Sequence, residues 1–554
     1  MRMGKRLIPA VILVLVATGL LRAQTYDIII RNGRVVDGSG NPWYAGDVAI
    51  RNGRIAAIGS LCLPGPCDAK RTIDAQGLVV APGFIDVHTH ADSGVQRNPG
   101  AANYVFDGVT SVIAGNCGGS PSDLGNFFSD LRQRGISINF GSLIGHGTVR
   151  SAVMRMERRD PTPEELARMS ALVEQAMRDG AVGLSTGLIY TPGSWAKTEE
   201  IISLARVAAK FGGIYATHLR NEGNDEQGGV FDAIEEALKV GREAGIPVEI
   251  SHFKVAGKDV WGKSDRTIAM VENARAAGLD VTVDQYPYTA SSTGLASMLP
   301  GWVQEGGREK YLERLSDPAT RRRLINEVKE RVRRRGFKRL DYAVVARCAS
   351  DSSLEGKSIT AINQAKGRKK KLESEIETAL DILAKGGASM IYHSMDEKDV
   401  ERIMRSEYSM VASDGGIVEF GVGVPHPRNY ATNARVLARY VRERRVLRLE
   451  EAIRKMTSLP AQRFCLVDRG LIRPGLCADL VVFDDRTVSD VSTYEKPHAL
   501  STGFHYVIVN GTVVIENAQH TGARPGQILL GPGARQASEA PTSAISAIAG
   551  AAGR

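Results

Sequence analysis

Six residues of metal-ligand or acid–base type each stand at the end of an apolar run in the sequence: His88, His90, Cys117, His218, His252 and Asp414. The first two lie two positions apart in DVHTH, so both point to the same side of an extended segment. The others occur in AGNCGGS, YATHLR, EISHFK and VASDGG. Imidazole and thiolate groups suit zinc, whereas hard ions such as magnesium prefer oxygen. We therefore expect the four histidines and the cysteine to hold zinc.

Zinc at such a site would support hydrolysis. A bound zinc ion lowers the pKa of water to about 7 and polarises a carbonyl oxygen. The attacking water must lose its proton to a base. That base must then return the proton to the departing nitrogen, because an amide anion is a poor leaving group. Asp414 is the candidate for both transfers, and the alternative is that it only caps a helix.

The candidate ligands must be positioned by strands, because each follows a run of β-type residues. Eight such runs occur at 84–90, 111–116, 138–145, 181–188, 213–219, 247–254, 281–288 and 408–415. Helical patterns separate several of them, at 163–179, 197–211, 230–244 and 264–278. This α/β alternation predicts a closed parallel (β/α)8 barrel of the TIM type, with its active site at the C-terminal ends of the strands. An open doubly wound sheet is less favoured, because no glycine-rich phosphate loop follows the first strand.

Both ends of the chain have short strand patterns punctuated by Asn-Gly or Asp-Gly turns, over 26–60 and 476–515. They predict one small β-sandwich built from both ends, and two unrelated β caps are the alternative. The expected organisation is therefore a sandwich of 24–82 and 466–530, a barrel of 83–465 with a long insertion at 289–407, and a disordered tail at 531–554.

The charge distribution argues against a nucleic-acid partner. The chain has 554 residues, of which 43% are hydrophobic and 24% charged, as in globular proteins. Its net charge of +9 comes from residues 1–23, which contribute +4, and residues 308–339, which contribute +8. The remaining residues carry about −3, so no basic field covers the protein. The basic cluster in the insertion predicts either a solvated helical face or a lid that attracts anionic substrates.

The first 23 residues have the pattern of a secretory signal peptide, with basic residues before an apolar run and a small residue at Ala23. A membrane anchor is the alternative, but the run is shorter than the roughly 20 residues that span a bilayer. We expect an exported protein, periplasmic or secreted, without a stable membrane anchor. In an oxidising compartment Cys62 could pair with Cys67, and Cys465 with Cys477, although the sequence does not determine either pairing.

At this point the motifs match a known family. The chain resembles the N-acyl-D-amino-acid deacylases (D-aminoacylases) of the amidohydrolase superfamily over about residues 26–530. The matching motifs are PGFIDVHTHAD at 82–92, GVTSVIAGNCGGS at 108–120, GLSTGLIYTPG at 183–193, ATHLRNE at 216–222, ISHFK at 250–254, VDQYPY at 283–288, SDGG at 413–416, HPR at 426–428 and DRGLIRPGLCADLVVFD at 468–484.

The resemblance implies one tight zinc on Cys117, His218 and His252, and a second, weaker position on His88 and His90 with the cysteine bridging. Asp414 matches the family's general acid/base. The resemblance also implies a group of residues around the α-carboxylate of the substrate: Lys254, Tyr286, Arg428 and, less directly, Tyr190. Surface salt bridges are the alternative for the two cations, and core packing is the alternative for the two tyrosines.

The predicted function is zinc-dependent hydrolysis of N-acyl-D-amino acids to a carboxylate and a D-amino acid. A dipeptidase acting on D-terminated dipeptides would use the same chemistry. A cyclic-amide hydrolase is a further alternative, but its relatives carry a carboxylated lysine on strand four, and AVGLSTGL has none. A non-catalytic binding protein on the same fold is the remaining alternative. The expected partner is a small molecule, and the sequence leaves the oligomeric state open.

Overall fold

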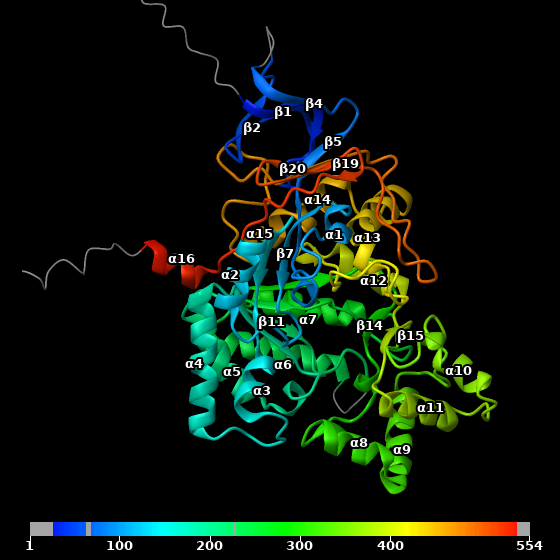
Figure 1. The fold of residues 1–554 in the computed structure, drawn as a ribbon. Coiled ribbons are helices and arrows are strands. Elements are labelled where there is room, and N and C mark those ends of the chain that lie inside the picture. Colours follow the sequence, from blue (N-terminus) through cyan, green and yellow to red (C-terminus); the bar gives the residue numbers. More distant parts are fainter. Residues whose placement is uncertain (1–25, 63–67, 225–228, 540–554) are drawn as a thin grey trace, which may run out of the picture.

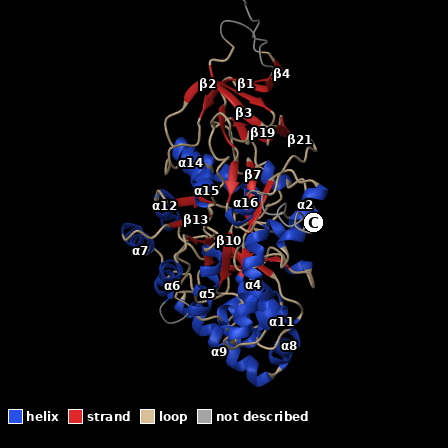
Figure 2. Cartoon of the chain, turned by 90° about the vertical axis from the view of Figure 1, so that its left-hand side faces the viewer, coloured by secondary structure: helices blue, strands red, loops and turns tan. Residues whose placement is uncertain are grey.

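The computed structural model describes residues 26–62, 68–224 and 229–539. These residues form a mixed α/β structure with three regions (Figure 1). The first and last strands of the chain lie together at one end, parallel strands with surrounding helices form the centre, and the helical insertion lies at the other end (Figure 2).

The central strands follow one another in chain order and pair in parallel. They are β6 (Phe84–Asp86), β7 (Val109–Ala114), β8 (Asn139–Ser142), β9 (Ile144–Gly145), β10 (Gly183–Gly187), β11 (Ile214–His218), β12 (Val248–Ile250), β13 (Val281–Gln285) and β17 (Ser409–Val411). Hydrogen bonds divide them into β6-β7-β8 and β9-β10-β11-β12-β13-β17. Only Leu143 separates β8 from β9, and a parallel bridge between Thr89 and Gly415 joins the ends of β6 and β17. The C-terminal ends of the eight predicted runs thus open toward a common region.

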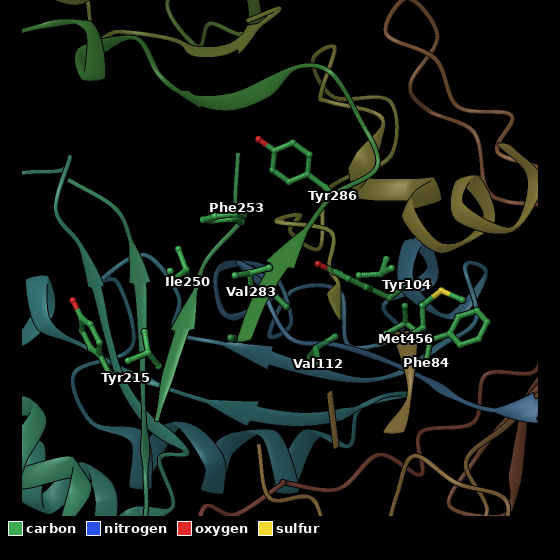
Figure 3. Packing of buried hydrophobic residues seen from close by; sticks show 14 of the residues in the cluster. Phe84, Tyr104, Val112, Tyr215, Ile250, Phe253, Val283, Tyr286 and Met456 are labelled. Carbon is green, nitrogen blue, oxygen red and sulfur yellow. The ribbon is translucent and has the colours of Figure 1, made fainter. Parts of the chain in front are cut away.

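These strands are buried along their whole length, as in parallel sheets covered by helices. Ile250 of β12 and Val283 of β13 belong to the main core, and Phe253 and Tyr286 lie beyond the ends of those strands (Figure 3). The predicted intervening helices are α4 (Pro163–Asp179), α5 (Thr198–Ala209), α6 (Gly229–Ala244) and α7 (Ser264–Ala276). Shorter helices complete the connections: α1 (Ala102–Val105), α2 (Leu124–Arg134), α3 (His146–Met154), α13 (Arg428–Arg435), α14 (Leu449–Met456) and α15 (Ser458–Arg463).

Strands from both chain ends form one nine-stranded sheet, in the order β21-β20-β19-β18-β5-β1-β2-β3, with β4 also paired to β1. Their bounds are β1 (Tyr26–Val35), β2 (Tyr44–Arg51), β3 (Arg54–Gly59), β4 (Ala69–Asp74), β5 (Val79–Pro82), β18 (Leu480–Phe483), β19 (Phe504–Val509), β20 (Thr512–Glu516) and β21 (Gln519–His520). The two ends meet where β5 pairs with β18 antiparallel. A separate core that includes Ile30, Val48 and Leu480 packs within this region.

The insertion between β13 and β17 has its own three-stranded sheet and its own hydrophobic core. Its elements are β14 (Ser291–Gly294), α8 (Arg308–Ser316), α9 (Pro318–Arg334), β15 (Ala343–Arg347), α10 (Ile359–Ala365), α11 (Leu372–Ala384), β16 (Ser389–Tyr392) and α12 (Glu397–Arg405). Helices α8 and α9 are separate because Asp317 caps α9 and Pro318 begins it.

One expectation needs correction, and one pairing that the sequence left open is resolved. The segment predicted as a disordered tail begins with helix α16 (Pro532–Glu539), which is anchored where Gly531 N donates to Gly180 O at 2.9 Å. Cys465 and Cys477 are free thiols rather than a disulfide, and the Cys477 thiol donates to the Asp468 carboxylate instead. Cys62 is disulfide-bonded, but its expected partner Cys67 lies outside the described residues, as does the predicted signal peptide. In the described part of the chain, no helix is long and apolar enough to cross a bilayer.

Candidate metal centre and active site

The structure brings together the ligand-type residues that end separate strands. His88 and His90 follow β6, Cys117 follows β7, and Asp414 follows β17. His218 is the last residue of β11, and His252 follows β12. Buried apolar neighbours fix each of these strands. The side chains at their C-terminal ends are therefore held close to one another.

One sulfur atom lies at the centre of this group. Cys117 Sγ is 3.3 Å from His88 Nε2, 3.5 Å from His218 Nδ1 and 3.6 Å from His252 Nε2. Cys117 is a free thiol, so its sulfur is available to a metal. The sulfur and the nitrogens of the latter two histidines lie within 4.8 Å of one another, which is a set that can hold one metal ion.

A second set shares the same sulfur and includes the carboxylate of Asp414. Its Oδ1 is 3.1 Å from His90 Nε2 and 3.5 Å from His88 Nε2. The ligand atoms of these three residues and Cys117 again lie within 4.8 Å of one another. The geometry therefore provides two adjoining positions with the thiolate between them.

The backbone at three of these residues adopts an unfavourable conformation. Cys117, His252 and Asp414 have φ values of 55°, 37° and 50°, in the left-handed region that side-chain-bearing residues rarely adopt. Such backbone strain persists only where the surrounding structure imposes it, and it is concentrated at functional sites. Here it directs side chains from the ends of three strands toward one point.

Two carboxylates behind the ligands, those of the buried Asp284 and the half-buried Glu222, were not predicted from the sequence. Asp284 Oδ2 lies 3.2 Å from His88 Nδ1, and its other oxygen accepts the His252 backbone N–H at 2.8 Å. Glu222 Oε1 lies 3.0 Å from His252 Nδ1. When a carboxylate accepts the Nδ1–H of a histidine, Nε2 is left unprotonated and faces the centre. The signal was present in the VDQYPY and ATHLRNE motifs, where Asp284 lies near the end of β13 and Glu222 comes after β11.

The charges of the site favour ionised ligands. Burial alone would raise the pKa of Cys117, but the charge of His88 and hydrogen bonds from the neighbouring histidines outweigh it and hold that pKa well below its usual range. Burial likewise opposes ionisation of Asp414, but Arg428 and the histidines lower its pKa well below the usual value. A thiolate and a carboxylate are therefore available at neutral pH.

Three of the four predicted substrate residues line one cavity, and the fourth, Arg428, is paired with Asp414. Lys254, Tyr286 and Tyr190 line one cavity, the Lys254 cavity, whose lining also includes His218, His252 and Asp414. Arg331 of α9 and Arg335, which directly follows that helix, also line the cavity. The insertion thus forms a wall of the site.

The two predicted cations differ in their partners. Lys254 Nζ donates to Glu222 at 2.5 Å, and its side chain lies within the cavity wall. Arg428 instead pairs with Asp414, with Nη1 2.9 Å from Oδ2, and it stacks over the Tyr286 ring. His426 fixes the start of this segment, because its Nδ1 accepts the Arg428 backbone N–H at 3.0 Å. Neither cation forms the surface salt bridge that was the alternative.

A sulfur and histidine nitrogens at the C-terminal ends of parallel strands, with a carboxylate beside them, define a metal-dependent hydrolase. Comparison with known proteins agrees. The model of the amidohydrolase family matches residues 71–515, and the chain belongs to this family. It is 36% identical to the D-aminoacylase of Alcaligenes xylosoxydans xylosoxydans, over 92% of this chain and 98% of the relative. It is 38% identical to the N-acyl-D-glutamate deacylase of the same organism, over 91% and 97%.

Solved structures show the same similarity. A D-aminoacylase structure, described for one-metal activation and second-metal attenuation in its binuclear centre, matches with a TM-score of 0.77 and 35% identity, over 91% of this chain and all of the other. The N-acyl-D-glutamate deacylase of Bordetella bronchiseptica, complexed with zinc and a phosphonate mimic of the tetrahedral intermediate, matches with a TM-score of 0.77 and 34% identity, over 92% of this chain and all of the other.

Proposed function

We propose that this protein is a zinc-dependent deacylase that hydrolyses N-acyl-D-amino acids to a carboxylate and a D-amino acid. One observation carries the proposal: the Cys117 sulfur lies within 3.6 Å of three histidine nitrogens, beside the carboxylate of Asp414. Family membership and the similarity to D-amino-acid deacylases over most of the chain support it.

The donor set fits zinc, because thiolate and imidazole are the ligands zinc prefers. Cys117, His218 and His252 would hold the tight ion, and His88 and His90 would complete a second position bridged by the same sulfur. When bound, zinc polarises the scissile carbonyl and increases the acidity of water. Cys117 would supply the anion that a carboxylated lysine provides in other members of the superfamily, since β10 reads GLSTG and has no lysine.

Asp414 moves the proton in this proposal. Its low pKa keeps it ionised, so it can accept a proton from the attacking water. The same carboxyl then donates that proton to the leaving nitrogen, and the amide C–N bond breaks. Arg428 holds Oδ2, which leaves Oδ1 facing the metal ligands. We therefore assign Arg428 to positioning Asp414 rather than to binding the carboxylate of the substrate.

The Lys254 cavity would hold the amino-acid half of the substrate. Lys254, which is paired with Glu222, and Arg331 and Arg335 place positive charge in its wall. An α-carboxylate is stabilised by such cations. Tyr190 and Tyr286 lie close to the ligands, with the Tyr190 ring centroid 4.8 Å from that of His218. Two residues of the basic segment 308–339, Arg331 and Arg335, therefore line the cavity where a lid for anionic substrates would contact the substrate.

The test uses the purified protein loaded with zinc and paired N-acetyl-D- and N-acetyl-L-amino acids. The proposal expects release of free D-amino acid and little or no hydrolysis of the L-enantiomers. Full zinc content without hydrolysis of any N-acyl-amino acid would reject the proposal. Turnover of hydantoins but not of linear amides would favour the cyclic-amide alternative.

The finer points of architecture and location belong to the same proposal. We propose that the eight parallel strands close as a (β/α)8 barrel, supported by the Thr89–Gly415 bridge, and that the nine-stranded sheet folds over its core as a sandwich.

We also propose export after removal of residues 1–23. Amino-terminal sequencing of the protein recovered from the periplasm or medium tests this, and a mature protein that begins at Met1 would contradict it.

A further inference from the structure

Strand β10 contributes none of the proposed metal ligands, yet two of its residues contact the turn that carries Cys117. Ser185 and Gly187 lie two positions apart, so both are on the same side of the strand. That side faces residues 115–118, which directly follow β7 and which we call the Cys117 turn. The GLSTG segment of β10 therefore contacts the backbone that presents the central sulfur.

The Ser185 hydroxyl joins the two ends of the Cys117 turn. It donates to Gly115 O at 2.5 Å and accepts from the Gly118 backbone N–H at 3.1 Å. In an ordinary four-residue turn the first carbonyl accepts directly from the fourth N–H. Here the hydroxyl lies between these two groups and satisfies both. Because Ser185 and both glycines are buried, removal of the hydroxyl would leave the two backbone groups without these partners where water has little access.

The Cys117 turn depends on such contacts because its backbone is strained. Gly115, Cys117 and Gly118 have φ values of 74°, 55° and 75°. Glycine adopts this left-handed region readily, but a residue with a side chain does so rarely. A strained conformation persists only where the surrounding structure imposes it. The two hydrogen bonds of Ser185 lie on either side of Cys117 in the sequence and therefore constrain its backbone directly.

Gly187 contributes to the same turn by having no side chain. A Cβ at Gly187 would lie 2.0 Å from Cys117 O, which is far closer than such atoms approach. The φ of Gly187 is not positive, so the close approach of the two backbones, rather than a special conformation, requires glycine there. A further contact comes from Thr148 of α3, whose backbone N–H donates to Gly118 O at 3.1 Å. The turn is thus held by both β10 and α3.

We propose that Ser185 and Gly187 are positioning residues that hold the Cys117 sulfur among the histidine nitrogens. The assignment rests on the proposed function, in which this sulfur is a metal ligand. Cys117 Sγ lies 3.3 to 3.6 Å from nitrogens of three histidines, so a small rotation of the turn would change all three distances together. Loss of a residue that orients a ligand without touching the metal weakens metal binding about 10- to 100-fold.

The first experiment removes the hydroxyl and measures zinc binding to the metal-free protein in competition with a chromophoric chelator. Ser185→Ala deletes a single oxygen atom and should weaken zinc binding about tenfold or more. Ser185→Thr retains the hydroxyl and should bind zinc more tightly than Ser185→Ala. Ser137→Ala is the matched control, because Ser137 is also fully buried and donates to a backbone carbonyl, Ala523 O at 2.8 Å, that belongs to no ligand segment. A loss below threefold in Ser185→Ala, or an equal loss in Ser137→Ala, would overturn the proposal.

The second experiment compares two glycines of the same strand. Gly187→Ala should displace the Cys117 carbonyl, whereas Gly183→Ala places its Cβ 2.2 Å from Ile214 O of β11. Both substitutions crowd a backbone oxygen, but only the first reaches the Cys117 turn. Cobalt(II) replaces zinc here, because a thiolate bound to cobalt gives a charge-transfer absorption. We expect folded Gly187→Ala to show less of this absorption than folded Gly183→Ala, and equal spectra would contradict the role of Gly187. Ser185→Ala tests the proposal by itself if either glycine variant does not fold.

The two levels of inference fail differently. If the metal-free wild type binds neither zinc nor cobalt, the proposed metal-dependent function is wrong. If the wild type binds zinc and Ser185→Ala binds it equally tightly, only the positioning role is wrong. Denaturant unfolding of the metal-free proteins identifies a general loss of stability. A serine that only supported the fold would lower the free energy of unfolding in Ser185→Ala, as in Ser137→Ala, without changing the zinc affinity of the folded protein.

Discussion

The carboxylate of Asp284 should control zinc affinity without itself touching the metal. It accepts from the His88 ring at 3.2 Å and from the His252 backbone N–H at 2.8 Å, so it orients two ligands at once. In Asp284→Asn the side chain keeps its size, but one oxygen becomes an amide that donates hydrogen bonds. Loss of such an outer partner costs about 10- to 100-fold in metal affinity. This corresponds to about 1.4 to 2.7 kcal/mol.

The assay is zinc binding in competition with a chromophoric chelator, at one pH, for wild type and variant. Asp107→Asn is the matched control, because Asp107 is also buried and accepts from two backbone N–H groups, but its hydrogen-bond partners Asn433, Ala434 and Ser501 are not candidate ligands. We expect weakened zinc binding in Asp284→Asn alone. If the two variants bind zinc within twofold of wild type, Asp284 does not orient the ligands.

Three further predictions concern separate groups. Asp414→Asn should retain zinc but lose about 10²- to 10⁴-fold in kcat, and a rate near that of wild type would remove Asp414 from the proton transfers. Cys117→Ala should lower zinc content below that of wild type, as measured by elemental analysis, and full stoichiometric content would argue against the bridging thiolate. Burial lowers the pKa of Lys455 to about 8. The unfolded chain therefore binds more protons between about pH 8 and 10.4, and wild type should gain about 2.5 kcal/mol of unfolding free energy over Lys455→Met from pH 7 to pH 10. Denaturant unfolding at both pH values measures this gain, and a constant difference would contradict it.

The strand-end pattern predicted the main features of the centre because parallel strands with common ends bring distant residues together. His218 and Cys117 are 101 positions apart, yet their atoms lie 3.5 Å from each other. Residues two positions apart point to the same side of an extended segment, which predicted that His88 and His90 lie together. The apolar runs predicted that the remaining ligands lie at strand ends. This reasoning requires only local patterns and the direction of the strands.

Other features depend on contacts that local patterns do not encode. The pairing of Arg428 with Asp414 arises from the path of the loop after β17, so the sequence could only identify a cation near the site. Glu222 and Asp284 are single acids in motifs already quoted, and only their distances show that they hold histidine rings. The sequence left a Cys465–Cys477 disulfide open, and the structure excludes it, because Cys477 is buried against Asp468 whereas Cys465 is exposed.

The strand pair that joins the two chain ends affects how this protein must be made. Pro82 of β5 faces Leu480 of β18, so that pair forms only after almost the whole polypeptide has been synthesised. Until then the edge of β5 stays unprotected, which exposes nascent chains to aggregation and makes late assembly slow. Carboxy-terminal truncations that remove β18 should therefore impair recovery of folded protein, even though the metal ligands all precede that strand.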